Sequence, residues 1–166
     1  MSINRVIFEK SVDFFAENKA ARYTLHFIYK ALPLLMLAAY PLLLIYAFFF
    51  LRSELFRLIL VPLGVYVAVA VLRIVINEKR PYEKYGKPSV FQKDTNGKSF
   101  PSRHTASAFI ISFAFLYVNM PIGIAFTVIS ALIAVSRILA GAHYVHDVIA
   151  GMAIGIVCGF VFFFLI

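Results

Sequence analysis

The chain has 166 residues, enough for one domain, and 62% of them are hydrophobic while only 14% are charged. With a mean hydropathy of +0.88, this composition excludes an ordinary soluble globule and indicates an integral membrane protein. The net charge of +8 favours membrane lipids or an anionic substrate as partners. Nucleic acid is excluded, because the basic residues flank apolar segments and no nucleic-acid-binding motif is present.

In chain order, an amphipathic segment comes first and a mostly apolar region follows. Residues 1–22 place apolar side chains at helical spacing between charges, which predicts an interfacial helix. Residues 23–166 form the expected transmembrane core. The predicted fold is therefore an all-α polytopic membrane helix bundle with about five transmembrane helices. The expected spans are 31–51, 58–76, a segment that opens at 100–104 and runs to about 118, 122–135 and 148–166.

The last span carries Gly151, Gly155 and Gly159 at intervals of four residues. Small residues at this spacing let two helices approach closely. A dimer contact would use the same pattern, but we expect this face to pack inside the bundle.

Two arginines open the first polar loop, which covers residues 78–104. Arg73 lies near the end of the second span, and Arg80 follows two helical turns later on nearly the same face, before Pro81 ends the helix. The pair either clamps a phosphate or snorkels to the interface. The four lysines of this loop that fall within residues 82–100 make either a solvated basic segment, which we favour, or a surface for anionic headgroups. They are Lys84, Lys87, Lys93 and Lys98.

Two further polar stretches carry histidines. Pro101 suits the first turn of a helix, whose free backbone N–H groups attract anions, and His104 would lie one turn into it. In the second loop, residues 136–147, a helical His143 and Asp147 would share one face. The carboxylate would then hold one imidazole nitrogen and leave the other as a base or nucleophile. The structural alternative is that these groups only cap two helices across a turn.

The spacing of these residues resembles the three-part signature of the type 2 phosphatidic acid phosphatase superfamily. The three motifs are Arg73 with Arg80-Pro81, then Pro101-Ser102-Arg103-His104, then Ser136-Arg137 followed by His143 and Asp147. The resemblance implies that His143 is the nucleophile that becomes phosphohistidine, that Asp147 orients it, and that His104 is the general acid. It implies no metal and no cofactor. The phosphate-binding residues that it implies are Arg73, Arg80, Ser102, Arg103 and Arg137.

Two positions depart from the family pattern. Arg73 stands where lysine is usual, and Arg103 stands where glycine is usual. Arg73 keeps the charge but changes the geometry of hydrogen bonding. We interpret Arg103 as an extra cation for a second phosphate or a neighbouring headgroup. His146 matches no family role, and we interpret it as an interfacial residue.

The resemblance predicts metal-independent dephosphorylation of a membrane lipid phosphate or diphosphate. Undecaprenyl diphosphate ranks narrowly before phosphatidylglycerol phosphate and phosphatidic acid, because the loop is densely cationic. One alternative is a vanadate-dependent haloperoxidase-like enzyme, which the apolar chain and Arg73 disfavour. The other is a non-enzymatic small membrane transporter or channel whose intramembrane charges line a pathway, and whose transport would survive loss of His143.

The expected location is the cell membrane, with several passes. A charge count over the N-terminal region favours a cytoplasmic face for the loops. The bacterial lipid phosphatases that the chain resembles act on the outer face, and we favour that orientation. A cysteine introduced at Lys87 should then react with an impermeant thiol reagent in intact cells, whereas the parent chain, with only Cys158 in an apolar run, should not. Protection of the new cysteine until the cells are lysed would reverse the orientation.

Overall fold

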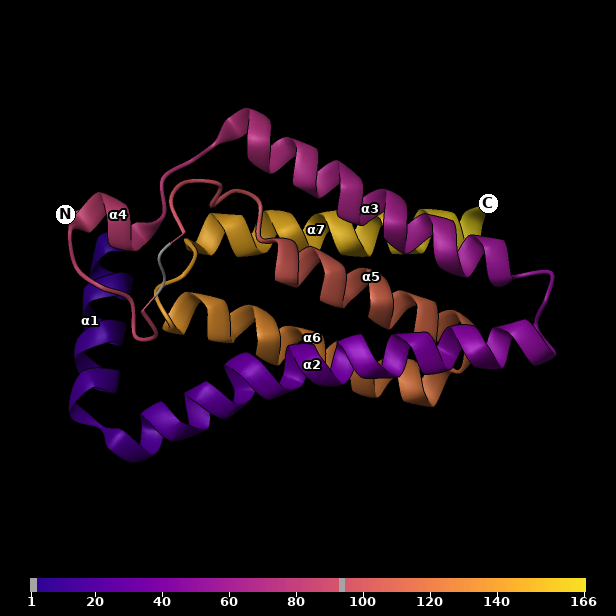
Figure 1. Ribbon diagram of the computed structural model, residues 1–166, viewed down its shortest axis with the longest axis horizontal. Coiled ribbons are helices and arrows are strands. Elements are labelled where there is room, and N and C mark those ends of the chain that lie inside the picture. Colours follow the sequence, from indigo (N-terminus) through magenta and orange to yellow (C-terminus); the bar gives the residue numbers. More distant parts are fainter. Residues whose placement is uncertain (1–2, 93–94) are drawn as a thin grey trace.

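The computed structural model describes residues 3–92 and 95–166, and these residues form helices joined by loops, without a strand among them (Figure 1). This confirms the all-α bundle. Lys93, one of the four loop lysines, lies outside the described residues. The helices are α1 (Ile3–Glu17), α2 (Lys19–Phe50), α3 (Leu55–Ile76), α4 (Pro81–Tyr85), α5 (Arg103–Val118), α6 (Met120–Leu139), α7 (Val145–Phe160) and the π-helical turn η1 (Val161–Leu165).

Four helical segments are long and apolar enough to cross a membrane. They are Lys19–Phe50, Leu55–Tyr85, in which α3 is followed by a short break and α4, Met120–Leu139, and Val145–Leu165. Large apolar side chains such as Leu37, Leu42 and Ile74 face outward, which suits contact with lipid tails because the backbone groups behind them are bonded within helices. The chain is therefore a multi-pass membrane protein.

The predicted third span is α5, which has 16 residues and is shorter than the four long segments. It runs through the middle of the bundle, where it contacts α2, α3, α6 and α7. Ala106, Ile110 and Ala114 belong to the main apolar core. Because its neighbours bury it, α5 is the element against which the others are positioned.

Glycines bring α7 into close contact with α5. A Cβ atom added at Gly151 would lie 2.5 Å from the carbonyl oxygen of Ser102, and one at Gly159 would lie 2.4 Å from the Phe113 ring. The expected packing of this glycine face inside the bundle is confirmed. It holds the N-terminal ends of α5 and α7 together.

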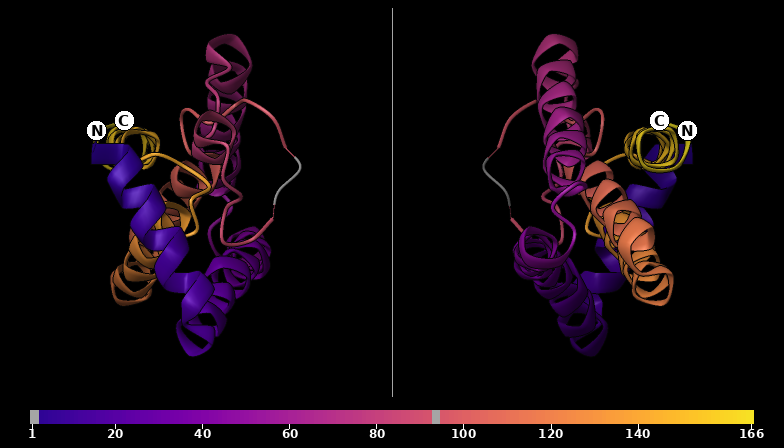
Figure 2. Two further views of the ribbon diagram at one scale, coloured as in Figure 1. Left: turned by 90° about the vertical axis from the view of Figure 1, so that its left-hand side faces the viewer. Right: turned by 90° about the vertical axis from the view of Figure 1, so that its right-hand side faces the viewer.

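The first helix crosses the end of the bundle that carries the polar loops. Figures 1 and 2 show α1 lying across the ends of the other helices, next to α4. Its buried face consists of Phe8, Val12 and Phe15, which pack in one cluster with Leu25 of α2 and with Ala140 and Ala142 of the second polar loop. The amphipathic segment is thus helical, and its apolar face covers protein.

Three sequence expectations about helix boundaries are wrong. Arg73 and Arg80 do not share one helix, because Asn77 takes a left-handed conformation (φ 44°) that ends α3, and Arg80 is extended.

The other two corrections concern the starts of α5 and α7. Pro101 does not lie in the first turn of α5 but precedes it, and the N-cap is Ser102. His143 precedes α7, because Gly141 turns the chain at φ 70° and Tyr144 caps the helix.

Replacing Gly155 with alanine should lower thermal stability. The new Cβ would lie 2.7 Å from the Cβ of Phe109 and 2.9 Å from the carbonyl oxygen of Ala106, and overpacking of this kind destabilises by about 1–3 kcal/mol. The matched control is Gly64→Ala in α3, where nothing lies within 4 Å and alanine is the better helix former. Thermal unfolding in detergent measures both, and equal midpoints would contradict the packing.

Candidate active site

The second and third motifs meet where α5 and α7 begin. The backbone N–H of Ser102 donates to the carbonyl oxygen of Asp147 at 2.9 Å. The close approach at Gly151 fixes the same pair of helix ends. Residues from opposite ends of the 102–147 segment are therefore brought to one place at the loop-bearing end of the bundle (Figure 1).

A buried carboxylate orients a buried imidazole. Asp147 Oδ2 lies 3.3 Å from Nδ1 of His143, and it accepts hydrogen bonds from the Ser99 hydroxyl at 2.6 Å and the Tyr144 N–H at 3.0 Å. The Asp147 side chain is 0% exposed and that of His143 is 2% exposed. The Nδ1 nitrogen thus faces the carboxylate, and Nε2 is the nitrogen on the opposite side of the ring.

The surroundings of His143 favour its neutral form. Burial lowers the pKa of His143 to about 4, and the positive charges of Arg80 and Arg73 act in the same direction, while Asp147 opposes them. A neutral imidazole keeps a lone pair on one nitrogen, which is the state that a nucleophile or base requires.

Backbone carbonyls hold two of the predicted arginines in place. One Nη1 of Arg73 donates to the carbonyl oxygens of Ser99 at 3.1 Å and Pro101 at 2.7 Å. Arg80 donates from Nε to Gly97 at 3.1 Å and from Nη1 to Ala142 at 3.3 Å. These contacts take up part of the five donors of each guanidinium and compensate for its burial.

Arg137, Arg103 and His104 line a cavity of about 530 Å³ between α2, α3, α5 and α6. The Arg137 guanidinium lies over the ring of Tyr29, 3.9 Å from its centroid, and donates to the Tyr29 carbonyl oxygen. Arg103 reaches the hydroxyl of Tyr66 at 3.4 Å. Lys30 and Ser107 also line the cavity, and the rest of its lining is apolar, formed by Pro33, Leu34, Met36, Leu37, Ala108, Ile111 and Ile133.

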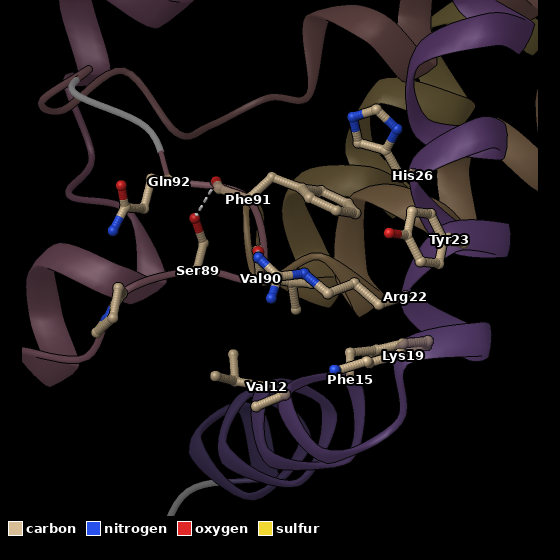
Figure 3. Close-up of a pocket in the computed structure, with 12 residues that line it drawn as sticks. Val12, Phe15, Lys19, Arg22, Tyr23, His26, Ser89, Val90, Phe91 and Gln92 are labelled. Carbon is tan, nitrogen blue, oxygen red and sulfur yellow. Dashed lines mark hydrogen bonds between the residues drawn. The ribbon is translucent and has the colours of Figure 1, made fainter.

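A second cavity, of about 710 Å³, lies between α1, the first turns of α2 and residues 88–92. Figure 3 shows Arg22, Tyr23 and His26 of α2 facing the loop that carries Phe91. Arg22 donates to the Val90 carbonyl oxygen at 3.2 Å. This cavity contains none of the predicted catalytic residues.

Most of the predicted site residues lie in one cluster. The charge of Arg73 lies close enough to the charges of Arg80, Arg103 and Asp147 to interact with them. Ser102 is completely buried, and its hydroxyl is hydrogen-bonded to that of Thr105 at 2.9 Å. The catalytic and phosphate-binding roles assigned to these residues stay predictions.

Sequence reasoning missed Ser99. Its N–H donates to the Glu78 carbonyl oxygen, its carbonyl oxygen accepts from Arg73, and its hydroxyl donates to Asp147. It thereby joins the first motif to the third. The only feature of the sequence that could have drawn attention to Ser99 is its position just before the second motif. His146, interpreted as interfacial, is partly exposed but contacts both Glu78 and Asp147.

The fold and the cluster together define a class: helical membrane proteins in which buried arginines and a buried histidine lie at one end of the bundle. This chain belongs to the PAP2 superfamily, whose sequence profile matches residues 54–166. The resemblance seen in the three motifs is thereby confirmed. The matched region begins at the N-cap of α3 and includes every predicted site residue.

Two individual proteins are similar to this chain over about half of its length. The chain is 35% identical over 92 residues to the undecaprenyl-diphosphatase BcrC of Bacillus subtilis, covering 55% of this chain and 47% of the relative. It is 37% identical over 90 residues to a lipid A 1-phosphatase of Rhizobium johnstonii, covering 51% and 36%. The chain thus spans half or less of the length of these relatives.

A solved structure matches nearly the whole chain. The crystal structure of LpxE from Aquifex aeolicus superposes with a TM-score of 0.73 at 27% identity, covering 96% of this chain and 92% of the other. The similarity therefore includes α1 and α2, which precede the part matched by the family profile.

The histidine resonances should reveal the neutral state of His143 directly. The chain has four histidines, so ¹³C-labelled imidazoles can be assigned by loss of one signal in His143→Ala. Because its pKa lies near 4, the His143 signal should not titrate between about pH 5.5 and 8 in metal-free detergent solution. A His143 midpoint near the ordinary value of about 6.5 would contradict this environment.

Proposed function

We propose that this chain is a metal-independent lipid phosphate phosphatase that works through a phosphohistidine intermediate, with residues 1–166 forming a single integral membrane phosphatase domain. The observation that carries the proposal is the buried pair of His143 and Asp147 beside Arg73 and Arg80. Membership of a superfamily whose named relatives include two lipid phosphatases supports it.

In this proposal the phosphoryl group binds among the guanidinium groups. Arginines suit this task because their planar forks match phosphate oxygens and stay charged at all physiological pH values. The backbone N–H groups at the start of α5 add donors on the same side. The residues that we assign to phosphate binding are Arg73, Arg80, Ser102, Arg103 and Arg137.

The lipid tail would lie in the cavity of about 530 Å³ whose lining includes Arg137 and His104. In this arrangement its arginines meet the phosphate, and its apolar lining includes Leu34, which is exposed on the side of the bundle that faces lipid. A lipid can therefore enter from the bilayer with its headgroup at the arginines and its tail in an apolar medium.

The first chemical step is attack of His143 Nε2 on phosphorus. The N–P bond forms while the bond from phosphorus to the leaving oxygen breaks, and His104 donates a proton to that oxygen. Asp147 keeps the Nδ1 side of the ring in place. The arginines neutralise the charge that spreads over the equatorial oxygens, which is the main demand of phosphoryl transfer.

Water then attacks the phosphohistidine. His104, which lost its proton in the first step, accepts one from this water as the O–P bond forms and the N–P bond breaks. Free phosphate leaves, and both imidazoles return to their starting states. Water is needed only in this second step, after the alcohol or lipid phosphate has left.

The preferred substrate is undecaprenyl diphosphate, ahead of phosphatidylglycerol phosphate and phosphatidic acid. The name of the Bacillus relative supports this order, and the name of the Rhizobium relative adds lipid A 1-phosphate to the candidates. We place the reaction at the outer face of the cell membrane. The haloperoxidase-like and transporter alternatives gain no support from the names of these relatives.

Phosphate release from purified lipid phosphates tests the proposal. His143→Ala should reduce the rate by at least about a thousandfold, because it removes the nucleophile, while the wild type should keep its rate in the presence of a chelator. Lys87→Ala, a loop cation outside the cluster, is the control and should retain activity. An absolute requirement for an added divalent ion, or full activity of His143→Ala, would reject the mechanism.

Phosphate release from purified mono- and diphosphate lipids also tests the role of Arg103. If its side chain binds a second phosphate, Arg103→Ala should lower kcat/KM for diphosphate lipids more than for monophosphate lipids, by about tenfold, as expected for one charge-assisted hydrogen bond. An equal loss on both classes would show that Arg103 does not select the diphosphate.

A further inference from the structure

Next to the buried pair, a second group of ligand-type side chains lies on the far side of Asp147. His146 Nε2 lies 3.2 Å from Glu78 Oε1 and 3.2 Å from Asp147 Oδ1. The potential donor atoms of these three residues all lie within 4.8 Å of one another. Glu78 and His146 take no part in the reaction described above, and that reaction uses Oδ2 of Asp147 and not Oδ1.

The hydrogen bonds within this group leave one buried atom unsatisfied. His146 Nε2 can donate only one proton, and its hydrogen-bonding geometry is met toward Glu78. Asp147 Oδ1 is completely buried and has no hydrogen-bond partner in the described part of the chain, although it is directed toward the same nitrogen. A buried carboxylate oxygen without a donor is costly unless another positive group balances it.

The distances suit a metal ion. With Zn–N and Zn–O bonds of about 2.0–2.1 Å, neighbouring donor atoms of a tetrahedral zinc site are about 3.3 Å apart. The separations from His146 Nε2 to each carboxylate oxygen, both 3.2 Å, agree with this value, and the carboxylate oxygens of Glu78 and Asp147 lie within 4.8 Å of each other. One imidazole and two carboxylates supply three protein ligands, and water can complete the tetrahedron. An imidazole in the donor set favours zinc over magnesium or calcium.

The three side chains are also held in position. The ring of His146 stacks on Tyr144 with a centroid distance of 5.1 Å and an interplanar angle of 9°. The carbonyl oxygen of Glu78 accepts from the N–H of Ser99, whose hydroxyl binds Asp147. The side chains of His146 and Glu78 are 47% and 33% exposed, so an ion can enter from solvent.

The geometry points to a Zn²⁺ site formed by Glu78, His146 and Oδ1 of Asp147, through which zinc inhibits the protein. Inhibition follows because Asp147 is shared between the two sites. A divalent cation on Oδ1 withdraws negative charge from the carboxylate, so Oδ2 holds His143 less firmly. The binding site rests on the described residues alone, whereas inhibition also rests on the proposed phosphatase activity.

Calorimetric titration of Zn²⁺ into the purified full chain in detergent tests the site. The wild type should bind one zinc ion, and Glu78→Gln and His146→Ala should each weaken binding by at least about tenfold. His26→Ala removes an exposed histidine beside Phe91 and should bind as the wild type does. Thermal unfolding checks that each variant is folded. Absence of saturable binding, or unchanged binding by folded His146→Ala, would overturn the site.

Phosphate release with added zinc tests the inhibition. Zinc should inhibit the wild type and His26→Ala at concentrations that match the calorimetric affinity, while His146→Ala should require at least about tenfold more. Zinc binding without inhibition of an active enzyme would overturn the coupling between the sites. If no lipid phosphate is hydrolysed, the proposed function fails, and the calorimetric result still decides the zinc site.

Discussion

The structure depends on one buried carboxylate. Asp147 is 0% exposed, and its Oδ2 atom collects contacts from His143, Ser99 and the Tyr144 N–H, while its backbone oxygen receives the N–H of Ser102. An ionised group in such surroundings is tolerable only when donors surround it. These donors come from the loops that precede α5 and α7, and the close packing of the two helices brings the loops together, so the glycines that permit this packing also help to hold the cluster in place.

The buried arginines also need hydrogen-bond partners, and because they are positively charged these partners are acceptors. Arg73 and Arg80 place part of their guanidinium groups against backbone carbonyl oxygens of the loops before α5 and α7. A lysine at position 73 would carry its three donors on one nitrogen, whereas the guanidinium binds both carbonyl oxygens through Nη1 and keeps the donors of Nε and Nη2. With arginine in place of the usual lysine, this residue links the first motif to the second through hydrogen bonds.

The fold could be predicted from the sequence because long apolar runs have few solutions in a bilayer. The meeting of the three motifs could be predicted because their spacing resembles a known family signature, while the roles of their residues stay predictions. Ser99 could not, since its importance arises only when a loop from before α5 meets the start of α7. Helix ends were also missed, because Asn77 and Gly141 act through left-handed backbone conformations that composition does not reveal. Likewise, the apolar face of α1 predicted burial, but not that it would cover Ala140 and Ala142.

The turn at Gly141 links that first helix to the second polar loop. A Cβ atom there would lie 2.6 Å from the ring of Phe8, and the residue also has φ 70°. Two independent restrictions, one of backbone shape and one of space, therefore fall on a single position. A smaller side chain at position 8 would relieve only the restriction of space, so a larger residue at position 141 would still strain the turn that the amino-terminal helix covers.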